Sequence, residues 1–578
     1  MIKKLIRQML AAQTLSALTV SLCLLIDNIM IARFLGVQAI AAYGLSNPIL
    51  LVIGAIGSML AAGVQVACSR SLGSGSKQET DKGYSSAIGV TLAISFVLTA
   101  LILLMRNSLA TLMGAGTEGE LFEQTKDYLA GFIIGAPGSM GALILVPFLQ
   151  MAGKSSLLIF AVLGMTVADI AFDLLNAFVF HGGMFGMGLA SSLSYYVAMV
   201  IALFYFLSKK CVFSFSVKYI TGEKIRELLI GGIPTVFAMA SSVLLIFILN
   251  RILLVEGGSD AVAAYATLQT IGNTSNCIST GIGGVSLTLS GILYNDEDVT
   301  GLKVLLKSLS RYAVILGAGM MLLLLLFAPA FVGVFISQGG AVRTFTIQGV
   351  RLFALGLIPC CINNALKSFY QGTDRVWLTE IISVLEGALL PALAAFILSR
   401  FWGVSGVWLN FIAGETMTLL FIAMFVWRRS HRCALNVQPF MMLREDFDVK
   451  PGNLMEINIH SLNDVEEASK QAENFCLQHG QNPQMANHIA LCVEEMASNT
   501  VIHGFSKEGK NNLSIRIQNK GRHWILRFRD DCRAFDPVSY VPKDEDDAIG
   551  IQLVMAMADD FRYTYSMNMN NLTIKLID

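Results

Sequence analysis

The chain has 578 residues, of which 54% are hydrophobic and only 14% are charged, and its mean hydropathy is +0.62. This balance is too apolar for an ordinary soluble protein of that size. Most of the chain must therefore face membrane lipid. The formal net charge of zero argues against a nucleic-acid partner, which would require a strongly basic surface.

Twelve apolar runs follow one another up to Trp427, and each is long enough for a bilayer core, which needs roughly 20 helical residues. Lys and Arg fall mainly in every second connection, so we expect a multi-pass plasma-membrane protein with both termini in the cytoplasm. The predicted spans are 11–32, 45–67, 86–105, 128–150, 157–180, 187–208, 228–254, 262–290, 310–336, 346–366, 377–399 and 405–427.

The two halves of this region match each other at a nearly constant spacing. Ala39-Ile-Ala-Ala-Tyr43 matches Ala261-Val-Ala-Ala-Tyr265 at an offset of 222, and Gly183-Met-Phe-Gly186 matches Gly403-Val-Ser-Gly406 at an offset of 220. The offset covers six spans, so both copies have one orientation and flank a cleft that can open to either side. The expected domains are a first six-helix half at 1–220, a second at 221–430, a linker at 431–453 and a soluble domain at 454–578.

Three carboxylic acids lie inside predicted spans of the first half, where an ionisable group costs at least about 2.5 kcal/mol on insertion scales. They are Asp27 in the first span and Asp169 and Asp173 in the fifth. Asp169 and Asp173 share a helix face, and two close carboxylates favour holding a proton. A proton or Na⁺ taken up there could be exchanged for a cationic substrate. The alternative is that Asp27 only hydrogen-bonds a neighbouring helix or is solvated at the end of its span. The acidic candidates of the second half are Glu380, Glu386 and Glu415.

Three segments of the membrane region carry a family resemblance: Asp27-Asn-Ile-Met-Ile-Ala-Arg-Phe-Leu-Gly36, Pro147-Phe-Leu-Gln-Met-Ala-Gly-Lys154, and Asp169-Ile-Ala-Phe-Asp173 through Gly188. They resemble the multidrug and toxic compound extrusion (MATE) family over roughly residues 5–430. The resemblance implies export of organic cations or other toxic compounds in exchange for H⁺ or Na⁺, with Asp27 and Asp173 on the family's acidic positions. Asp169 stands where the family more usually has Asn. Some members have a cation-binding Glu near the position of Ser242. Because this chain has Ser there, the resemblance favours ion coupling through the acids of the first half.

The tail after the membrane region reads as an α+β domain. Its expected helices are 463–478, 483–503 and 549–558, and its expected strands are 455–460, 513–518, 524–529, 562–566 and 572–577. On the second helix, Glu495, Asn499 and His503 repeat every four residues along one face. A Glu and an Asn one turn apart can hold water and Mg²⁺ against a triphosphate.

Two further motifs follow that helix in the tail, Arg529-Asp-Asp-Cys-Arg-Ala-Phe-Asp-Pro537 and Ala548-Ile-Gly-Ile-Gln-Leu-Val554. With Glu495-Met-Ala-Ser-Asn499 they resemble the GHKL ATPase superfamily, specifically the anti-sigma-factor serine kinases, over about residues 455–578. The resemblance implies ATP and Mg²⁺ as cofactors, with Asn499 binding the metal, Glu495 as general base, Asp530 bonding the adenine amino group and Gly550 lining the phosphate loop. The chain departs from the family pattern at Cys532, Ala534 and Ala548, where glycines or a proline are usual.

Three functions remain open at this stage. The first is a secondary antiporter for organic cations whose nucleotide-binding tail regulates it or reports on it, with a regulatory protein as the expected partner of the tail. The second is a membrane sensor whose tail acts as an ATP-dependent serine kinase or binding module. The third is a lipid-linked saccharide flippase, which would need several basic residues in its cleft. The chain has no GxxxxGK[ST] loop, so an ion gradient is the expected energy source.

Overall fold

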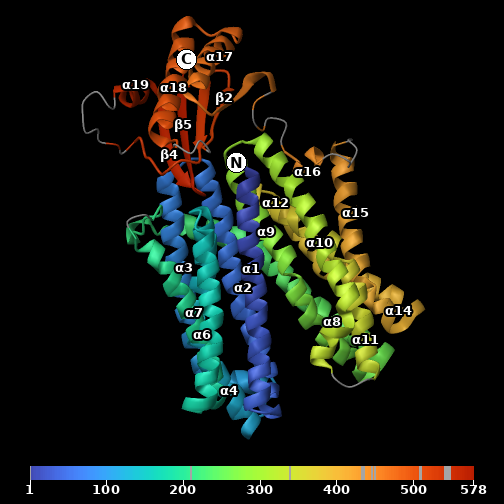
Figure 1. Ribbon diagram of the computed structural model, residues 1–578. Coiled ribbons are helices and arrows are strands. Elements are labelled where there is room, and N and C mark those ends of the chain that lie inside the picture. Colours follow the sequence, from blue (N-terminus) through green and yellow to red (C-terminus); the bar gives the residue numbers. More distant parts are fainter. Residues whose placement is uncertain are drawn as a thin grey trace.

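The computed structural model of the chain describes residues 2–208, 211–336, 340–430, 437–443, 447, 449, 451–506, 511–538, 540 and 549–577. These residues form a long helical bundle and, at one end of it, a smaller domain with a β-sheet (Figure 1). The first half of the bundle contains α1 (Ile2–Phe34), α2 (Val37–Gly73), α3 (Lys77–Leu112), α4 (Glu120–Ile133), α5 (Ala136–Met151), α6 (Ser155–Leu175), the π-helical turn η1 (Asn176–Phe180), α7 (Gly183–Phe206) and the short 3₁₀ turn η2 (Val217–Tyr219). The second half contains α8 (Gly222–Ser275), α9 (Cys277–Asn295), α10 (Val299–Phe335), α11 (Ala341–Leu355), α12 (Leu357–Gly372), α13 (Val376–Val384), the π-helical turn η3 (Leu385–Leu389), α14 (Leu390–Trp408) and α15 (Asn410–Ser430).

Nine helices in the described part of the chain are long and apolar enough to cross a membrane, or eleven if each bent pair counts as one span. The bent pairs are α4 with α5 and α11 with α12. The remaining expected span is α1, whose 33 residues extend over about 50 Å. This helix packs against α6 and α9 and runs the length of the bundle (Figure 1). The predicted fold class, a polytopic helical membrane protein with an α+β tail, is confirmed.

The two halves repeat each other in their backbone breaks. Gly36, between α1 and α2, and Gly258, inside α8, have φ of 88° and 65°, a conformation that favours glycine. They lie 222 residues apart, the offset found in the sequence, so α8 consists of two helices joined at Gly258. The bend between α4 and α5 is 45° and that between α11 and α12 is 49°. These matching breaks support an internal duplication.

A pair of turns also corresponds at this offset, but its chemistry differs between the halves. Ser74-Gly75-Ser76 joins α2 to α3, and Asp296-Glu297-Asp298 joins α9 to α10. Ser76 caps α3 by accepting a hydrogen bond from the Glu79 amide at 3.4 Å. Asp298 caps α10 by accepting one from the Gly301 amide at 2.7 Å. The turn is therefore polar in the first half and acidic in the second.

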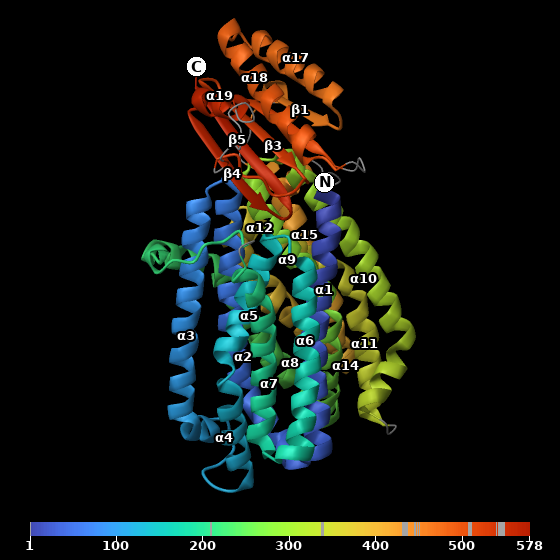
Figure 2. The ribbon, with the colours of Figure 1, turned by 60° about the vertical axis from the view of Figure 1, so that its left-hand side comes forward.

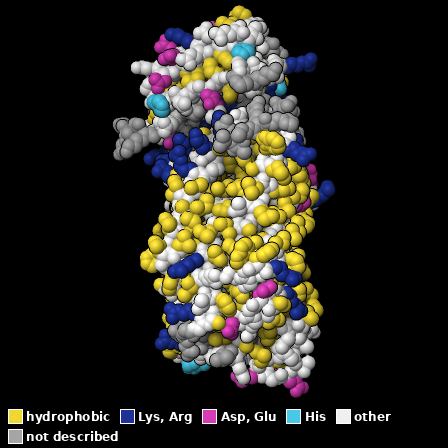
Figure 3. Space-filling model, turned by 90° about the vertical axis from the view of Figure 1, so that its right-hand side faces the viewer, with side chains coloured by type: hydrophobic (Ala, Val, Ile, Leu, Met, Phe, Trp, Pro, Cys, Tyr) yellow, Lys and Arg dark blue, Asp and Glu magenta, His cyan; other side chains and the backbone are white. Residues whose placement is uncertain are grey.

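The outer surface of the bundle is apolar, as a lipid-facing surface must be. Figure 3 shows a broad band of hydrophobic side chains on one face, with Lys and Arg gathered between this band and the tail domain. The large hydrophobic side chains that are more than half exposed include Phe96, Leu104, Phe160, Phe204 and Leu326.

The tail domain is one antiparallel sheet covered by helices on one face (Figure 2). Its strand order is β1-β2-β3-β5-β4. Side chains of β3 alternate, so that Trp524, Leu526 and Phe528 are buried in the core under the helices. Between the bundle and this domain lies the short helix α16 (Gln438–Met441). The domain's elements are the 3₁₀ turn η4 (Pro451–Asn453), β1 (Leu454–Ile459), α17 (Leu462–Gln478), α18 (Pro483–Asn499), the π-helical turn η5 (Thr500–Gly504), β2 (Leu513–Asn519), β3 (His523–Asp530), α19 (Ile549–Met557), β4 (Asp560–Ser566) and β5 (Met569–Ile577).

Two helix ends differ from the sequence prediction. α17 begins at Leu462 because Ser461 and Asp464 form a capping box, whereas we expected the helix to begin at 463. The helix expected at 483–503 changes at Asn499 into η5, a wider turn of the kind often found at functional sites. The periodicity of apolar residues does not reveal such a change.

Candidate functional site

The three acidic residues of the first half lie together inside the bundle. Asp27 comes from α1, and Asp169 and Asp173 come from α6, which packs against it. Their exposed fractions are 5%, 2% and 0%. The carboxyl groups are therefore removed from both lipid and bulk water.

Hydrogen bonds connect part of this acidic group to α7. The Ser191 hydroxyl donates to Asp27 Oδ2 at 3.2 Å. Asp169 lies beside Asp27 and near Ser194, whose hydroxyl donates to the Ser191 carbonyl at 2.8 Å. A carboxylate can only accept, so a hydrogen bond between two carboxyl groups requires a proton on one of them.

Several oxygens of the group have no hydrogen-bond partner. They are Oδ1 of Asp27, Oδ1 of Asp169 and both carboxyl oxygens of Asp173. Within the described part of the chain, no Lys or Arg neutralises these three groups. Because an unpaired charge is strongly disfavoured in such a place, uptake of a proton or a small cation would stabilise the group.

Glycines allow α7 to approach this part of the bundle closely. A Cβ atom on Gly188 would lie 2.5 Å from the Tyr128 carbonyl oxygen, and one on Gly131 of α4 would lie 2.2 Å from the Phe185 carbonyl oxygen. At the start of α7, Asn176 of η1 bonds the Gly182 amide at 3.0 Å and the Gly183 carbonyl at 3.1 Å. These contacts fix α6 and α7, which carry two of the acids and both serines.

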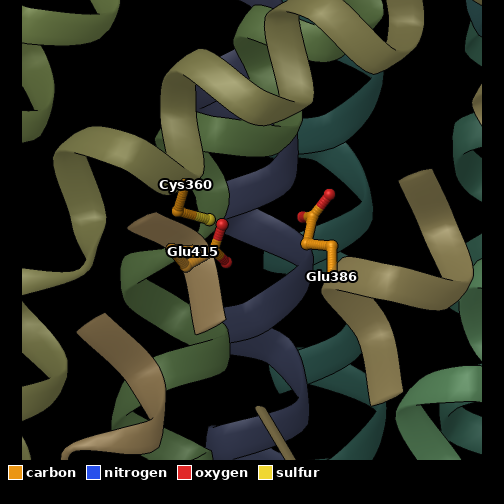
Figure 4. Close-up of side chains that lie close together, drawn as sticks. All are labelled: Cys360, Glu386 and Glu415. Carbon is orange, nitrogen blue, oxygen red and sulfur yellow. The ribbon is translucent and has the colours of Figure 1, made fainter. Parts of the chain in front are cut away.

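The acidic residues of the second half are arranged differently. Glu386 of η3 and Glu415 of α15 lie near Cys360 of α12 (Figure 4), and their ligand atoms all lie within 4.8 Å of one another. All three line one cavity, and Ser242 lines it as well. Glu380 of α13 does not line this cavity.

A second cavity, of about 320 Å³, lies in the tail domain between α18, η5 and the sheet. Asn499, His503 and Gly504 line it from the helix side, and Asp530 lines it from the end of β3. Phe528 and Tyr563 add aromatic walls. One carboxylate among flat apolar surfaces fits a purine ring, so the side chains present are compatible with a nucleotide.

Asp530 is held in place by a small buried network. It accepts hydrogen bonds from Asn570 Nδ2 at 2.7 Å and from the Cys532 amide at 2.9 Å. The Tyr563 hydroxyl donates to Asn570 Oδ1 at 2.6 Å. Burial raises the pKa of Asp530, although both hydrogen bonds oppose this rise. The sequence did not indicate that Asn570 and Tyr563 contribute to this network, because they lie on the last two strands, outside any motif.

Glu495 and Gly550 lie against each other although neither lines the cavity. A Cβ atom on Gly550 would lie 1.9 Å from Glu495 Oε2, so a side chain there would displace the Glu495 carboxylate. The neighbouring Glu494 instead accepts a hydrogen bond from Ser469 of α17 at 3.4 Å. The two consecutive glutamates therefore have different neighbours. Ala548, a predicted departure from the family pattern, lies outside the described residues.

The uncovered face of the sheet lies on the membrane region and carries basic side chains. Arg527 Nη1 lies 2.8 Å from Asp296 Oδ1, and Arg529 pairs with Asp296 and, at 3.4 Å, with Asp298. Arg516 also pairs with Asp298 at 3.6 Å, and Lys520 pairs with Glu297. The acidic turn of the second half is therefore bound by four cations of the tail.

The same domain also contacts the first half. The Met567 amide donates to the Met151 carbonyl at 2.6 Å, and Asn568 Nδ2 donates to the Gly153 carbonyl at 2.9 Å. Arg562 donates to the Ser74 carbonyl at 3.3 Å. One domain thus bridges both halves of the bundle.

Family comparisons agree with these two regions. Residues 13–175 match the MatE family, and residues 460–576 match the histidine kinase-like ATPase domain. The chain joins a MATE transporter region to a histidine kinase-like ATPase domain. The MATE region is similar to the multidrug export protein MepA of Staphylococcus saprophyticus, with 24% identity over 407 residues that cover 69% of this chain and 88% of the relative. It is also 24% identical to the uncharacterized transporter YisQ of Bacillus subtilis over 406 residues, covering 67% of this chain and 86% of the relative.

Solved structures show the fold of the MATE region. A MATE crystal structure in complex with MaL6 matches with a TM-score of 0.69 and 20% identity, covering 74% of this chain and 96% of that one. A transporter of the MOP superfamily from Pyrococcus furiosus, whose binding pocket is described as having reverse polarity, matches with a TM-score of 0.68 and 21% identity at the same coverage.

Proposed function

We propose that the protein is a secondary antiporter that exports organic cations or other toxic compounds in exchange for H⁺ or Na⁺, and that its tail regulates transport. The observation that carries this proposal is Asp173, a fully buried carboxyl group without a hydrogen-bond partner. It lies one helical turn from Asp169, which lies beside Asp27. The named relative, a multidrug export protein, supports the same class of cargo.

The chemistry of the acidic group suits exchange rather than permanent binding. Three carboxyl groups without a basic partner hold a proton or Na⁺ as long as the site is shielded from water. When one side of the cleft opens, water stabilises the carboxylates and the ion can leave. Uptake of the ion on one side of the membrane and its release on the other then accompany the movement of cargo, which links the two fluxes.

Regulation by the tail is supported by its position across both halves. Alternating access requires one half to rock against the other. A domain that pairs with Asp296 and Asp298 of one half and bonds Met151 and Gly153 of the other resists that movement on its own side of the membrane. We place that side in the cytoplasm, where ATP and Mg²⁺ are available to Asn499 and Asp530.

Transport by the purified full chain in proteoliposomes tests the antiporter. An imposed pH or Na⁺ gradient should drive ethidium flux, and Asp173→Asn should abolish the driven component. Glu123→Gln is the matched control, because Glu123 is an exposed acid of the same half that pairs with Lys126. Wild-type vesicles in which neither gradient drives flux would refute the proposal.

A second candidate, a serine kinase in the tail, is favoured by the contact between Glu495 and Gly550. A general base must lie beside the nucleotide phosphates, and Gly550 is the residue expected to line them. Phosphate transfer from ATP by the full chain should then be lost in Glu495→Gln and kept in Glu494→Gln. Equal rates in the two variants would remove the kinase.

A further inference from the structure

The second half of the bundle contains a cavity of about 250 Å³ that the acids of the first half do not explain. It lies between α8, the bend from α11 to α12, the turn η3, and α15. Figure 4 shows Glu386 and Glu415 directed toward the same space as Cys360. The π-helical turn η3 inserts an extra residue at Glu386, and such turns often accompany binding sites.

The charges around this cavity do not balance. Lys367 Nζ lies 3.1 Å from Glu386 Oε2, so this pair is neutral. Glu415 Oε2 instead accepts a hydrogen bond from Asn363 Nδ2 at 2.8 Å, which brings no charge. In the described part of the chain the cavity lining holds two carboxylates and one ammonium group. It therefore lacks one positive charge.

Two buried polar side chains in the lining independently point to a ligand. Asn410 is 0% exposed, and its Oδ1 has no hydrogen-bond partner, while its Nδ2 donates to the Val407 carbonyl at 2.5 Å. Ser383 is 2% exposed, and its hydroxyl has no partner either. Buried polar atoms are nearly always satisfied in folded proteins, so unpartnered acceptors that line a cavity mark a place for a donor.

We propose that this cavity binds an organic monocation, with Glu415 as its counter-ion and Asn410 and Ser383 as hydrogen-bond partners. The remaining walls fit such a molecule, because Phe353, Phe411 and Leu245 present rings and an aliphatic chain to it. A divalent metal fits less well, since the Lys367 ammonium already occupies Glu386 and the walls are largely apolar. The proposal rests on the proposed function in one respect, namely that the bound cation is the exported cargo.

Binding of ethidium, a fluorescent organic monocation, to the full chain in nanodiscs tests the site through fluorescence anisotropy. Glu415→Gln should weaken binding at least tenfold, and Glu415→Asp, which keeps the charge, should restore part of the affinity. Glu380→Gln is the matched control, because Glu380 is an acid of α13 that does not line the cavity. This variant should bind ethidium with the affinity of the wild type. Unchanged affinity in Glu415→Gln would overturn the proposal.

Two further arms separate this proposal from its alternatives. Asp27→Asn should still bind ethidium through Glu415 but should lose gradient-driven flux, so failure of the antiporter and failure of this site give different results. Zn²⁺ should not displace ethidium from the wild type. Displacement by Zn²⁺ that disappears in Cys360→Ser would show a metal site and would also overturn the proposal.

Discussion

Arg529 and Asp530 are consecutive residues of β3, yet they serve opposite faces of the sheet. Arg529 pairs with Asp296 and Asp298 of the membrane region, whereas Asp530 lines the cavity in the tail domain. Asn570 and Asn571 of β5 repeat this division, because Asn570 bonds Asp530 at 2.7 Å and Asn571 accepts a hydrogen bond from Arg529 at 2.9 Å. Two neighbouring strands thus connect the nucleotide cavity to the docking contacts.

This connection predicts that loss of Arg529 loosens docking. In Arg529→Ala, Asp296 keeps Arg527 but Asp298 loses one of its two arginines. Hydrogen–deuterium exchange of the turn 296–298 should therefore become faster in the full chain. Lys470→Ala is the control, since Lys470 pairs with Glu466 on the exposed side of α17. Identical exchange in both variants would contradict the docking role of Arg529.

Nucleotide binding should depend on Asn499. This residue lines the tail cavity at the end of α18, and its amide oxygen is the metal ligand implied by the family resemblance. Asn499→Ala should reduce Mg-ATP affinity more than tenfold, as measured by calorimetry on the full chain. Asn458→Ala, an exposed position on β1, should bind as the wild type does. If both variants bind equally, Asn499 does not hold the metal.

Asp530 should make the stability of the domain depend on pH. Burial raises the pKa of Asp530 in the folded state, so the folded protein binds more protons than the unfolded one between the ordinary value, about 4, and the raised value. Its contribution to the free energy of unfolding therefore falls as the pH rises through this window. Asp530→Asn should melt later than the wild type at neutral pH, and the difference should vanish at pH 3. A constant difference in melting temperature would contradict this assignment.

The joint inside α8 provides a test of backbone geometry. Gly258 has φ of 65° and open space around its Cα, so Gly258→Ala should destabilise by about 1–2 kcal/mol through backbone strain alone. Gly319 in α10 also has open space but no such conformation, so Gly319→Ala should stabilise by about 0.5–1 kcal/mol. Thermal unfolding of both variants in the same detergent would show shifts of opposite sign.

Much of the fold could be predicted from the sequence because the signals are local. Apolar runs predict membrane helices, and alternating residues such as those of β3 predict half-buried strands. The π-helical turns could not be predicted, since one extra residue hardly changes the apolar pattern around Glu386 or Asn499.

Contacts between distant segments were also beyond the sequence. The pairs of Arg527 and Arg529 with Asp296 join residues more than 200 positions apart, and each side alone reads as an ordinary charged surface. The cavity at Glu415 has the same character, because Asn363, which bonds Glu415, lies on α12 and Glu386 lies on η3. We could predict Asp27, Asp169 and Asp173 as one group from the sequence because charged residues are so rare inside membrane spans.

The single tail makes a duplicated transporter asymmetric. Equivalent turns of the two copies consist of Ser74-Gly75-Ser76 and Asp296-Glu297-Asp298. Of these two turns, the second forms ion pairs with arginines of the sheet. A second tail could not be seated in the same way on the first copy, because its serines give no counter-charge to the arginines. In the described residues the second half therefore binds the domain through ion pairs, whereas the first half binds it through hydrogen bonds to backbone carbonyls.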